Sequence, residues 1–216
     1  MTRALARTHF HSSPLLRFLL DLSLAQAVPQ HAFAEKLGQW LDFKHAIALC
    51  AAHGASTANT PAAPAVVSTS AHQEFTRVQA ALAHSIRHNS AVPILELGLE
   101  LAAAYAPYRR YYAAQQREME QNIRPLRAQL RHALTRAAPA LSKLALLDGA
   151  LEGILLEREA SLLSKLPRLF EQHFGQLFQA HQQALAHTQQ ADDPARWVQP
   201  GAWLARFEQD LQTLLL

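Results

Sequence analysis

The chain has 216 residues, of which half are apolar and 17% are charged, with a formal net charge of +3. This length supports a substantial core, and a single cysteine excludes an intrachain disulfide or a cysteine-based zinc site. Ala and Leu dominate the apolar residues, whereas Gly and the strand-forming residues are few, so the composition predicts an all-α protein.

An N-terminal pair of helices is predicted within residues 1–52. The first follows the motif SSP, in which a serine caps the helix and Pro14 takes its first position. The early residues superficially resemble a signal peptide, but Arg17 and Asp21 interrupt the apolar stretch, so we expect no secretion signal. A second, single helix is expected over 33–52. No apolar run is long enough to predict a membrane span.

Residues 53–70, HGASTANTPAAPAVVSTS, are interpreted as a flexible linker. They have no hydrophobic periodicity and no Asp, Glu, Lys or Arg, and they are rich in Ser, Thr, Pro and Ala. A third helix is expected over about 71–89, which begins a helical hairpin or bundle domain over 71–216. Its inward positions are predicted to be Phe75, Val78, Leu82 and Ile86.

The stretch from about 94 to 188 predicts a long antiparallel helical hairpin. Pro125 predicts a kink or a restart of the first arm, Pro139 a tight reversal, and Pro167 the start of a further segment. The apolar positions of the first arm are spaced by threes and fours: Tyr105, Tyr108, Tyr112, Met119, Ile123, Leu126 and Leu130. The second arm is expected to pack through Leu141, Leu144, Leu151, Leu155, Leu162 and Leu166.

The two arms differ in charge. Segment 101–136 has seven Arg against two Glu, whereas the rest of the chain after it has six basic and nine acidic residues. This distribution predicts charge-matched packing, or a patch left for an anionic partner. With a reversal near residue 138, Arg124 is expected to lie near Glu152.

Arginines recur every seven residues along the first arm, at positions 110, 117, 124 and 131. On a helix they would form a stripe about 31 Å long. Such forked donors can bind successive phosphates, but they can also pair with another helix or face solvent, and Glu120 is spaced to pair with Arg117 and Arg124. The candidate residues for a nucleic acid or another anionic partner are Arg109, Arg110, Arg117, Arg124, Arg127 and Arg131.

The last predicted helix, GAWLARFEQDLQTLLL, is amphipathic. Its apolar face requires a partner surface, either within the chain or in an oligomer. The candidate residues for a partner-helix interface are Leu204, Phe207, Leu211 and Leu214.

Enzyme and metal signatures are weak in this sequence. His84 and His88 have the spacing of two metal ligands on a helix, but the nearest acids are distant in sequence, so we predict no metal site and no cofactor. There is no glycine-rich phosphate loop, nucleophile elbow, HExxH or CxxC motif, and we expect a non-enzymatic protein. A hydrolase site assembled in space remains an alternative. The acidic residues of the second arm are interpreted as counter-charges to the basic arm: Asp148, Glu152, Glu157 and Glu159.

Three stretches together resemble an uncharacterised proteobacterial family, a domain of unknown function. They are RTHFHSSPLLRFLLDL (7–22), FAEKLGQWLDFKHAIAL (33–49) and YRRYYAAQQREMEQNIRPLRAQLR (108–131), with LALLDGALEGILLEREASLL (144–163) as a weaker fourth. The family is similar to the F component of type III Zorya anti-phage defence, encoded beside an OmpA/MotB-like and a MotA-like membrane protein. The resemblance implies a cytosolic accessory protein that receives a signal from a proton-driven motor or acts on invading DNA, and it carries over no catalytic residue.

The missing enzyme motifs predict a non-enzymatic interaction protein, and the resemblance implies that it is a component of a bacterial anti-phage system. It is expected in the cytoplasm, where a lone Cys50 would stay reduced, and without direct membrane insertion. The expected partner is a protein of the same defence set or a second copy of the chain, bound through helical surfaces. Nucleic-acid binding through the arginine stripe is the alternative, and its steep salt dependence would distinguish it from an apolar interface.

Overall fold

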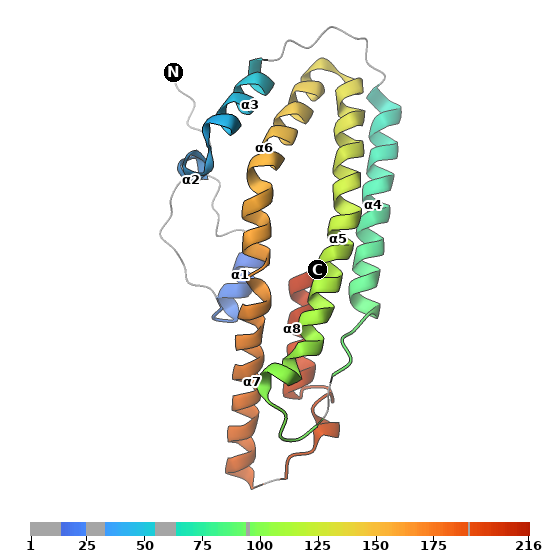
Figure 1. Cartoon of the computed structure of the whole chain (residues 1–216). Coiled ribbons are helices and arrows are strands. Elements are labelled where there is room, and N and C mark those ends of the chain that lie inside the picture. Colours follow the sequence, from blue (N-terminus) through green and yellow to red (C-terminus); the bar gives the residue numbers. More distant parts are fainter. Residues whose placement is uncertain (1–13, 25–32, 55–63, 94–95, 190) are drawn as a thin grey trace, which may run out of the picture. The chain divides into compact units, whose positions relative to one another are not determined.

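The computed structural model describes residues 14–24, 33–54, 64–93, 96–189 and 191–216 (Figure 1). Within these ranges the secondary structure is helical and contains no strand, which confirms the all-α prediction. None of the helices described is both long and apolar enough to cross a membrane. The helices are α1 (Pro14–Asp21), α2 (Phe33–Trp40), α3 (Phe43–Gly54), α4 (Pro64–His88), α5 (Leu101–Ala137), α6 (Pro139–Leu163), α7 (Leu166–Thr188), the short 3-10 helix η2 (Pro194–Arg196) and α8 (Trp203–Leu215).

The described residues form two compact units, which we treat separately. The first unit comprises residues 14–17, 33–54, 64–78 and 122–163. The second comprises residues 18–24, 79–93, 96–121, 164–189 and 191–216. Both α4 and α5 contribute residues to both units, so the units are assembled from segments distant in sequence.

The predicted helix over 33–52 is in fact two helices, and the expectation of one is wrong. The break falls at Asp42, whose side-chain Oδ1 accepts a hydrogen bond from the His45 amide at 2.7 Å. The Asp42 carbonyl oxygen also accepts from the Ala46 amide at 3.0 Å. Asp42 is therefore the N-cap of α3, satisfying an amide that has no partner within the helix.

The predicted linker, 53–70, is too long at both ends. Residues 53–54 complete α3, and residues 64–70 form the first turns of α4. The remaining part of this prediction, residues 55–63, lies outside the described residues. Pro64 explains the earlier helix start, because its fixed φ and missing amide hydrogen suit the first helical position.

In the first unit, α5 and α6 form the predicted antiparallel hairpin. α5 ends at Ala137 and α6 begins at Pro139, so Ala138 alone makes the reversal, and its carbonyl oxygen accepts from the Ser142 amide at 2.8 Å. The helix does not restart at Pro125, contrary to one of the two expectations for that residue. Pro125 is exposed, so water can satisfy the backbone carbonyl that the proline leaves without a donor.

Helices α2 and α3 also belong to the first unit. α3 packs against α6, and the guanidinium carbon of Arg158 on α6 lies 5.9 Å from the ring centre of Trp40 on α2.

Several positions predicted to face inward are exposed instead: Phe75, Ile123, Leu144 and Leu162. Small residues such as Ala137 and Ala145 are buried in this unit. Because leucines occur all around α6, spacing alone does not identify its buried face.

The core of the second unit is an aromatic cluster on α5, α7 and α8. Its fully buried side chains are Tyr105, Tyr108, Phe170, Phe174 and Phe207. The ring centres of Phe207 lie 5.0 Å from those of Tyr108 and Phe174, in edge-to-face geometry that favours aromatic pairs. α7 begins at Leu166 with Pro167 in its first turn, which confirms the predicted new segment.

Candidate functional site

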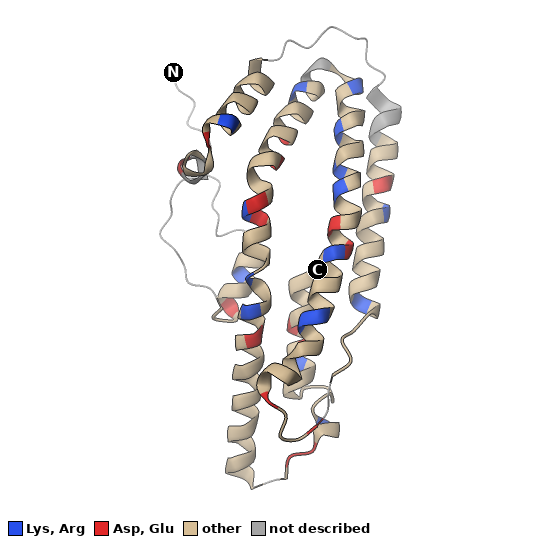
Figure 2. Ribbon diagram, in the orientation of Figure 1, with Lys and Arg blue, Asp and Glu red and all other residues tan. Residues whose placement is uncertain are grey.

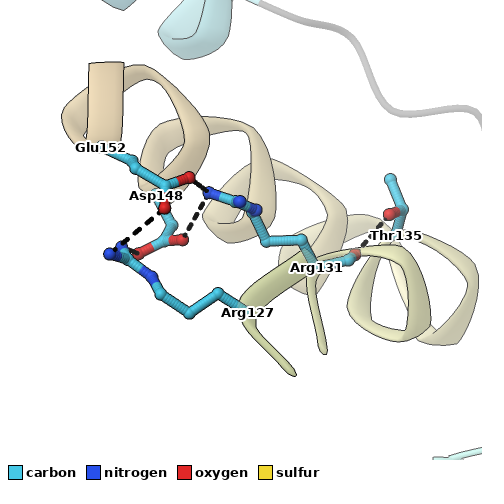
Figure 3. A network of polar contacts seen from close by, with 5 residues as sticks. All are labelled: Arg127, Arg131, Thr135, Asp148 and Glu152. Atoms are coloured by element: carbon cyan, nitrogen blue, oxygen red, sulfur yellow. Dashed lines mark hydrogen bonds and ion pairs between the residues drawn. The ribbon is translucent and has the colours of Figure 1, made fainter. Parts of the chain in front are cut away.

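The structure divides the six candidate arginines into two groups. Arg127 and Arg131 form a network with Asp148 and Glu152 of α6 (Figure 3). Arg127 lies 3.1 Å from Asp148 Oδ1 and 3.4 Å from Glu152 Oε1. Arg131 lies 3.3 Å from Asp148 Oδ2 and also pairs with Glu152. Each arginine therefore contacts both carboxylates, and these two charges are neutralised within the first unit.

The spacing on each helix creates this network. Arg127 and Arg131 are four residues apart, as are Asp148 and Glu152, so each pair projects from one face of its helix. The acidic residues of α6 were interpreted as counter-charges, and the structure shows this for Asp148 and Glu152. The four side chains remain partly exposed, so we expect only a modest contribution to stability.

The register of the network differs from the prediction that Arg124 lies near Glu152, which is wrong. Glu152 contacts Arg127 and Arg131, which are closer to the reversal. Side chains on a helix lean toward its N-terminus, so those on α5 lean away from the reversal and those on α6 lean toward it. In an antiparallel pair the two displacements add. Glu152 therefore contacts arginines whose Cα atoms lie closer to the reversal than the α5 residue that is level with its own Cα.

The second group of arginines is exposed: Arg109, Arg110, Arg117 and Arg124. None of them forms an ion pair with a carboxylate in the described parts of the chain. The Nε of Arg117 donates instead to the Ala113 carbonyl of its own helix at 3.2 Å, so its spacing from Glu120 is not used. Figure 2 shows basic residues along α5 and acidic residues on α6. These four arginines are the part of the predicted anionic-partner site that stays accessible.

The candidate partner-helix interface is used mainly within the chain. Leu204, Phe207 and Leu211 are buried in the second unit, and Phe207 is completely inaccessible. Leu214 is half-buried. The first three residues are therefore unavailable to another molecule in this conformation, which favours the alternative of a partner surface within the chain over an oligomer. An apolar helix face does not specify its own partner, and here the aromatic residues of α5 and α7 supply it.

His84 and His88 contact each other rather than converging on further ligands. Their rings stack with centres 3.9 Å apart, and His88 Nδ1 lies 2.9 Å from the His84 carbonyl oxygen. Among the described residues, no group of three or more His, Cys, Asp or Glu side chains is arranged to hold a metal ion. This pair therefore provides no basis for a metal centre.

Two partly buried polar pairs of the second unit were not predicted from the sequence. Tyr108 donates its hydroxyl hydrogen to Glu208 Oε1 at 2.9 Å, and His173 Nε2 lies 2.8 Å from Asp210 Oδ2. Burial raises the pKa of Glu208, although the hydrogen bond from Tyr108 acts in the opposite direction. Burial also raises the pKa of Tyr108, and it raises the pKa of Tyr112 to about 12. Both pairs join α8 to its neighbours, which indicates a structural role.

A third polar group missed by the sequence interpretation surrounds Asp192. Its Oδ1 lies 2.8 Å from Trp197 Nε1 and 3.0 Å from His181 Nε2, and its Oδ2 accepts from Gln182 Nε2 at 3.0 Å. Burial alone would raise the pKa of Asp192, but these hydrogen bonds outweigh it and hold the pKa below its ordinary value. The only sequence signal was a polar segment between two helices, which did not indicate a structured site.

Comparisons with known proteins place the sequence in a family whose function is not described. The family model "Protein of unknown function (DUF3348)" matches residues 1–216. No curated protein matches the chain, and no solved structure matches it either. The resemblance to an uncharacterised family is thereby confirmed, and the chain belongs to the DUF3348 family over all of its 216 residues.

Proposed function

We propose that the protein is a non-enzymatic interaction component of a bacterial anti-phage defence system. It acts in the cytoplasm and binds a protein of the same system or a second copy of itself. The observation that carries this proposal is the apolar side chains that α3 and α6 expose in the first unit.

What we call the α3/α6 apolar surface comprises Phe43 and Ile47 on α3 and, on α6, Leu144 and Leu162, which are five helical turns apart and share one face. Phe43 is 82% exposed and Ile47 is 54% exposed, and their spacing of four places them on one face of α3. Single exposed apolar residues are ordinary, but two packed helices with several of them indicate a surface that contacts another protein.

The resemblance of four stretches to the F component of type III Zorya supports the choice of system. In that arrangement a membrane pair forms a proton-driven motor, and a cytosolic protein has to receive its signal. An α-helical protein with an apolar helix face suits such a relay, because helix-in-groove contacts are a common mode of protein recognition. Membership of an uncharacterised family is compatible with this role.

The test compares two variants in a binding assay with the proteins encoded beside this one. The double variant Phe43→Gln/Ile47→Gln changes the exposed face of α3 without entering a core. Its matched control, Val92→Gln, changes an equally exposed apolar residue of the second unit. We expect the double variant to weaken the complex, or the self-association, by at least about tenfold and to reduce protection against phage. The control should behave as wild type.

The proposal fails if wild type binds neither a neighbouring protein nor itself at tens of micromolar. It also fails if the double variant binds and protects as well as wild type, because the surface then carries no partner.

Nucleic-acid binding is the second candidate. The observation that favours it is that Arg109, Arg110, Arg117 and Arg124 remain exposed while Arg127 and Arg131 are neutralised. Unpaired arginines are available to phosphates, and such contacts show a steep dependence on salt.

A further inference from the structure

The second unit contains a cavity that no feature of the sequence predicted. Its volume is about 450 Å³, which is within the usual range of small-molecule sites. It lies among the segment before α5, the first turns of α5, α7, η2 and α8. Five aromatic side chains line it: Tyr108, Phe174, Phe178, Trp197 and Trp203.

The charged groups of the cavity are all acidic. Glu96 and Asp192 line it, and no Lys or Arg from the described part of the chain does. The pKa of Asp192 is held below its ordinary value by its three hydrogen bonds, so this side chain stays a carboxylate at neutral pH. The cavity therefore combines aromatic walls with negative charge.

Trp203 adds an unused hydrogen-bond donor. Its indole Nε1 is buried and has no acceptor among the described residues. The ring is nevertheless held in place, with its centre 5.2 Å from that of Phe174, 5.5 Å from that of Trp197 and 5.9 Å from that of His181. A buried donor without an acceptor costs free energy, and the packed neighbours hold this ring in place at the cavity wall.

We propose that this cavity binds a small organic cation of the quaternary ammonium class. Aromatic faces attract such cations through the ring quadrupole, and the attraction grows when water is excluded. Glu96 and Asp192 supply the long-range attraction. This site is independent of the proposed partner-binding surface, which lies on the first unit.

Other classes of ligand fit the cavity less well. An anion would meet two carboxylates and no base. An inorganic cation would need several free oxygen ligands, but both carboxylate oxygens of Asp192 already take part in hydrogen bonds. A neutral apolar molecule would leave the negative charge of the wall without a partner. A quaternary ammonium ion can contact the aromatic walls and compensate the negative charge at the same time.

The test uses choline as the probe with the full-length protein. Binding is followed by calorimetry and by tryptophan fluorescence, since Trp197 and Trp203 both line the cavity. The control ligand is the uncharged alcohol in which carbon replaces the choline nitrogen, so its shape is the same. We expect choline to bind about tenfold more tightly than this alcohol. Equal binding of the two, or no binding of choline even at tens of millimolar, would overturn the proposal.

Two matched variants place the binding in this cavity. Glu96→Gln removes an exposed lining charge, and Glu100→Gln removes an exposed charge four residues away that does not line the cavity. We expect the first to weaken choline binding by about threefold or more and the second to leave it unchanged. Trp203→Phe, checked for an unchanged melting temperature, should also weaken it because the stronger cation–π ring is lost. Choline binding that Glu96→Gln does not alter would overturn the assignment to this cavity.

Discussion

At the scale of single residues, the second unit buries polar groups in pairs. Tyr108 meets Glu208, His173 meets Asp210, and the Tyr105 hydroxyl donates to the Pro167 carbonyl oxygen at 2.7 Å. An aromatic cluster alone permits many packings of nearly equal energy, whereas a buried donor requires its acceptor in one place. The first two pairs therefore fix the position of α8 on the apolar cluster, and the third joins α5 to α7.

Glu208 makes the stability of the protein depend on pH. Its pKa is raised by burial in the folded chain, so the folded state holds its proton to a higher pH than the unfolded state. The stabilising effect of the protonated form is complete below the ordinary glutamate pKa and is lost as pH rises through the raised pKa. We expect the free energy of unfolding of wild type to fall across this window relative to that of Glu208→Gln.

Urea titrations at a series of pH values from below the ordinary glutamate pKa to neutral measure this difference. Glu100→Gln is the control, because that side chain is exposed and has no part in the contact with Tyr108. Parallel curves for wild type and Glu208→Gln would show that burial does not perturb this carboxyl group.

Polar burial of this kind could not be predicted from the sequence. The apolar face of the last helix was identified from spacing, and Leu204, Phe207 and Leu211 are indeed buried. Glu208 directly follows Phe207, and its proximity to Tyr108 depends on how α8 rotates against α5. That rotation is set by tertiary packing, which local spacing does not contain.

At the scale of the helices, three prolines marked boundaries as predicted, whereas the restart expected at Pro125 did not occur and the Asp42 cap was missed. Pro14, Pro139 and Pro167 mark helix starts as predicted, because proline limits the backbone wherever it occurs. Asp42 separates the two helices only because its side chain accepts a hydrogen bond from a backbone amide, and this hydrogen bond competes with continuation of a single helix. Apolar residues flank Asp42 on both sides, so the sequence pattern predicted one continuous helix.

The hairpin of α5 and α6 allows a direct test of the side-chain lean that sets its register. In a double-mutant cycle, Arg131→Gln and Glu152→Gln should show a coupling energy of about 0.5–1 kcal/mol, because the pair is partly exposed. The coupling should decrease at high salt. Chemical denaturation of the four proteins of the cycle measures it.

Arg124 provides the matched control for this cycle. It is the arginine that a register based on Cα positions would place beside Glu152, and it forms no ion pair with a described residue. A cycle of Arg124→Gln with Glu152→Gln should therefore show no coupling. Coupling to Arg124 in place of Arg131 would refute the register described above.

At the scale of the whole molecule, composition predicted the fold class but not the grouping into units. An excess of Ala and Leu with few strand-formers is sufficient for an all-α protein. The two units, however, share α4 and α5, so no boundary in composition separates them. The cavity of the second unit was equally hidden, because its lining comes from segments far apart in the chain.

The arginines of α5 allow an experiment that separates nucleic-acid binding from protein binding through an apolar surface. A phosphate contact releases counterions and contributes about −0.9 to the slope of log K against log salt on duplex DNA, whereas an apolar interface is nearly insensitive to salt. If the four exposed arginines bind phosphates, the slope should be about −3 to −4. The double variant Arg127→Gln/Arg131→Gln should leave that slope unchanged, since Asp148 and Glu152 already occupy these side chains.

The decisive comparison is therefore between two sets of arginines on the same helix. Changing Arg109, Arg110, Arg117 and Arg124 to Gln should flatten the salt dependence of DNA binding, as measured by fluorescence anisotropy with labelled duplex and single-stranded DNA. A wild-type protein that fails to bind at low salt, or a quadruple variant that binds as well as wild type, would contradict phosphate contact by this helix. Either result would favour the α3/α6 apolar surface over phosphate contact as the basis of partner binding.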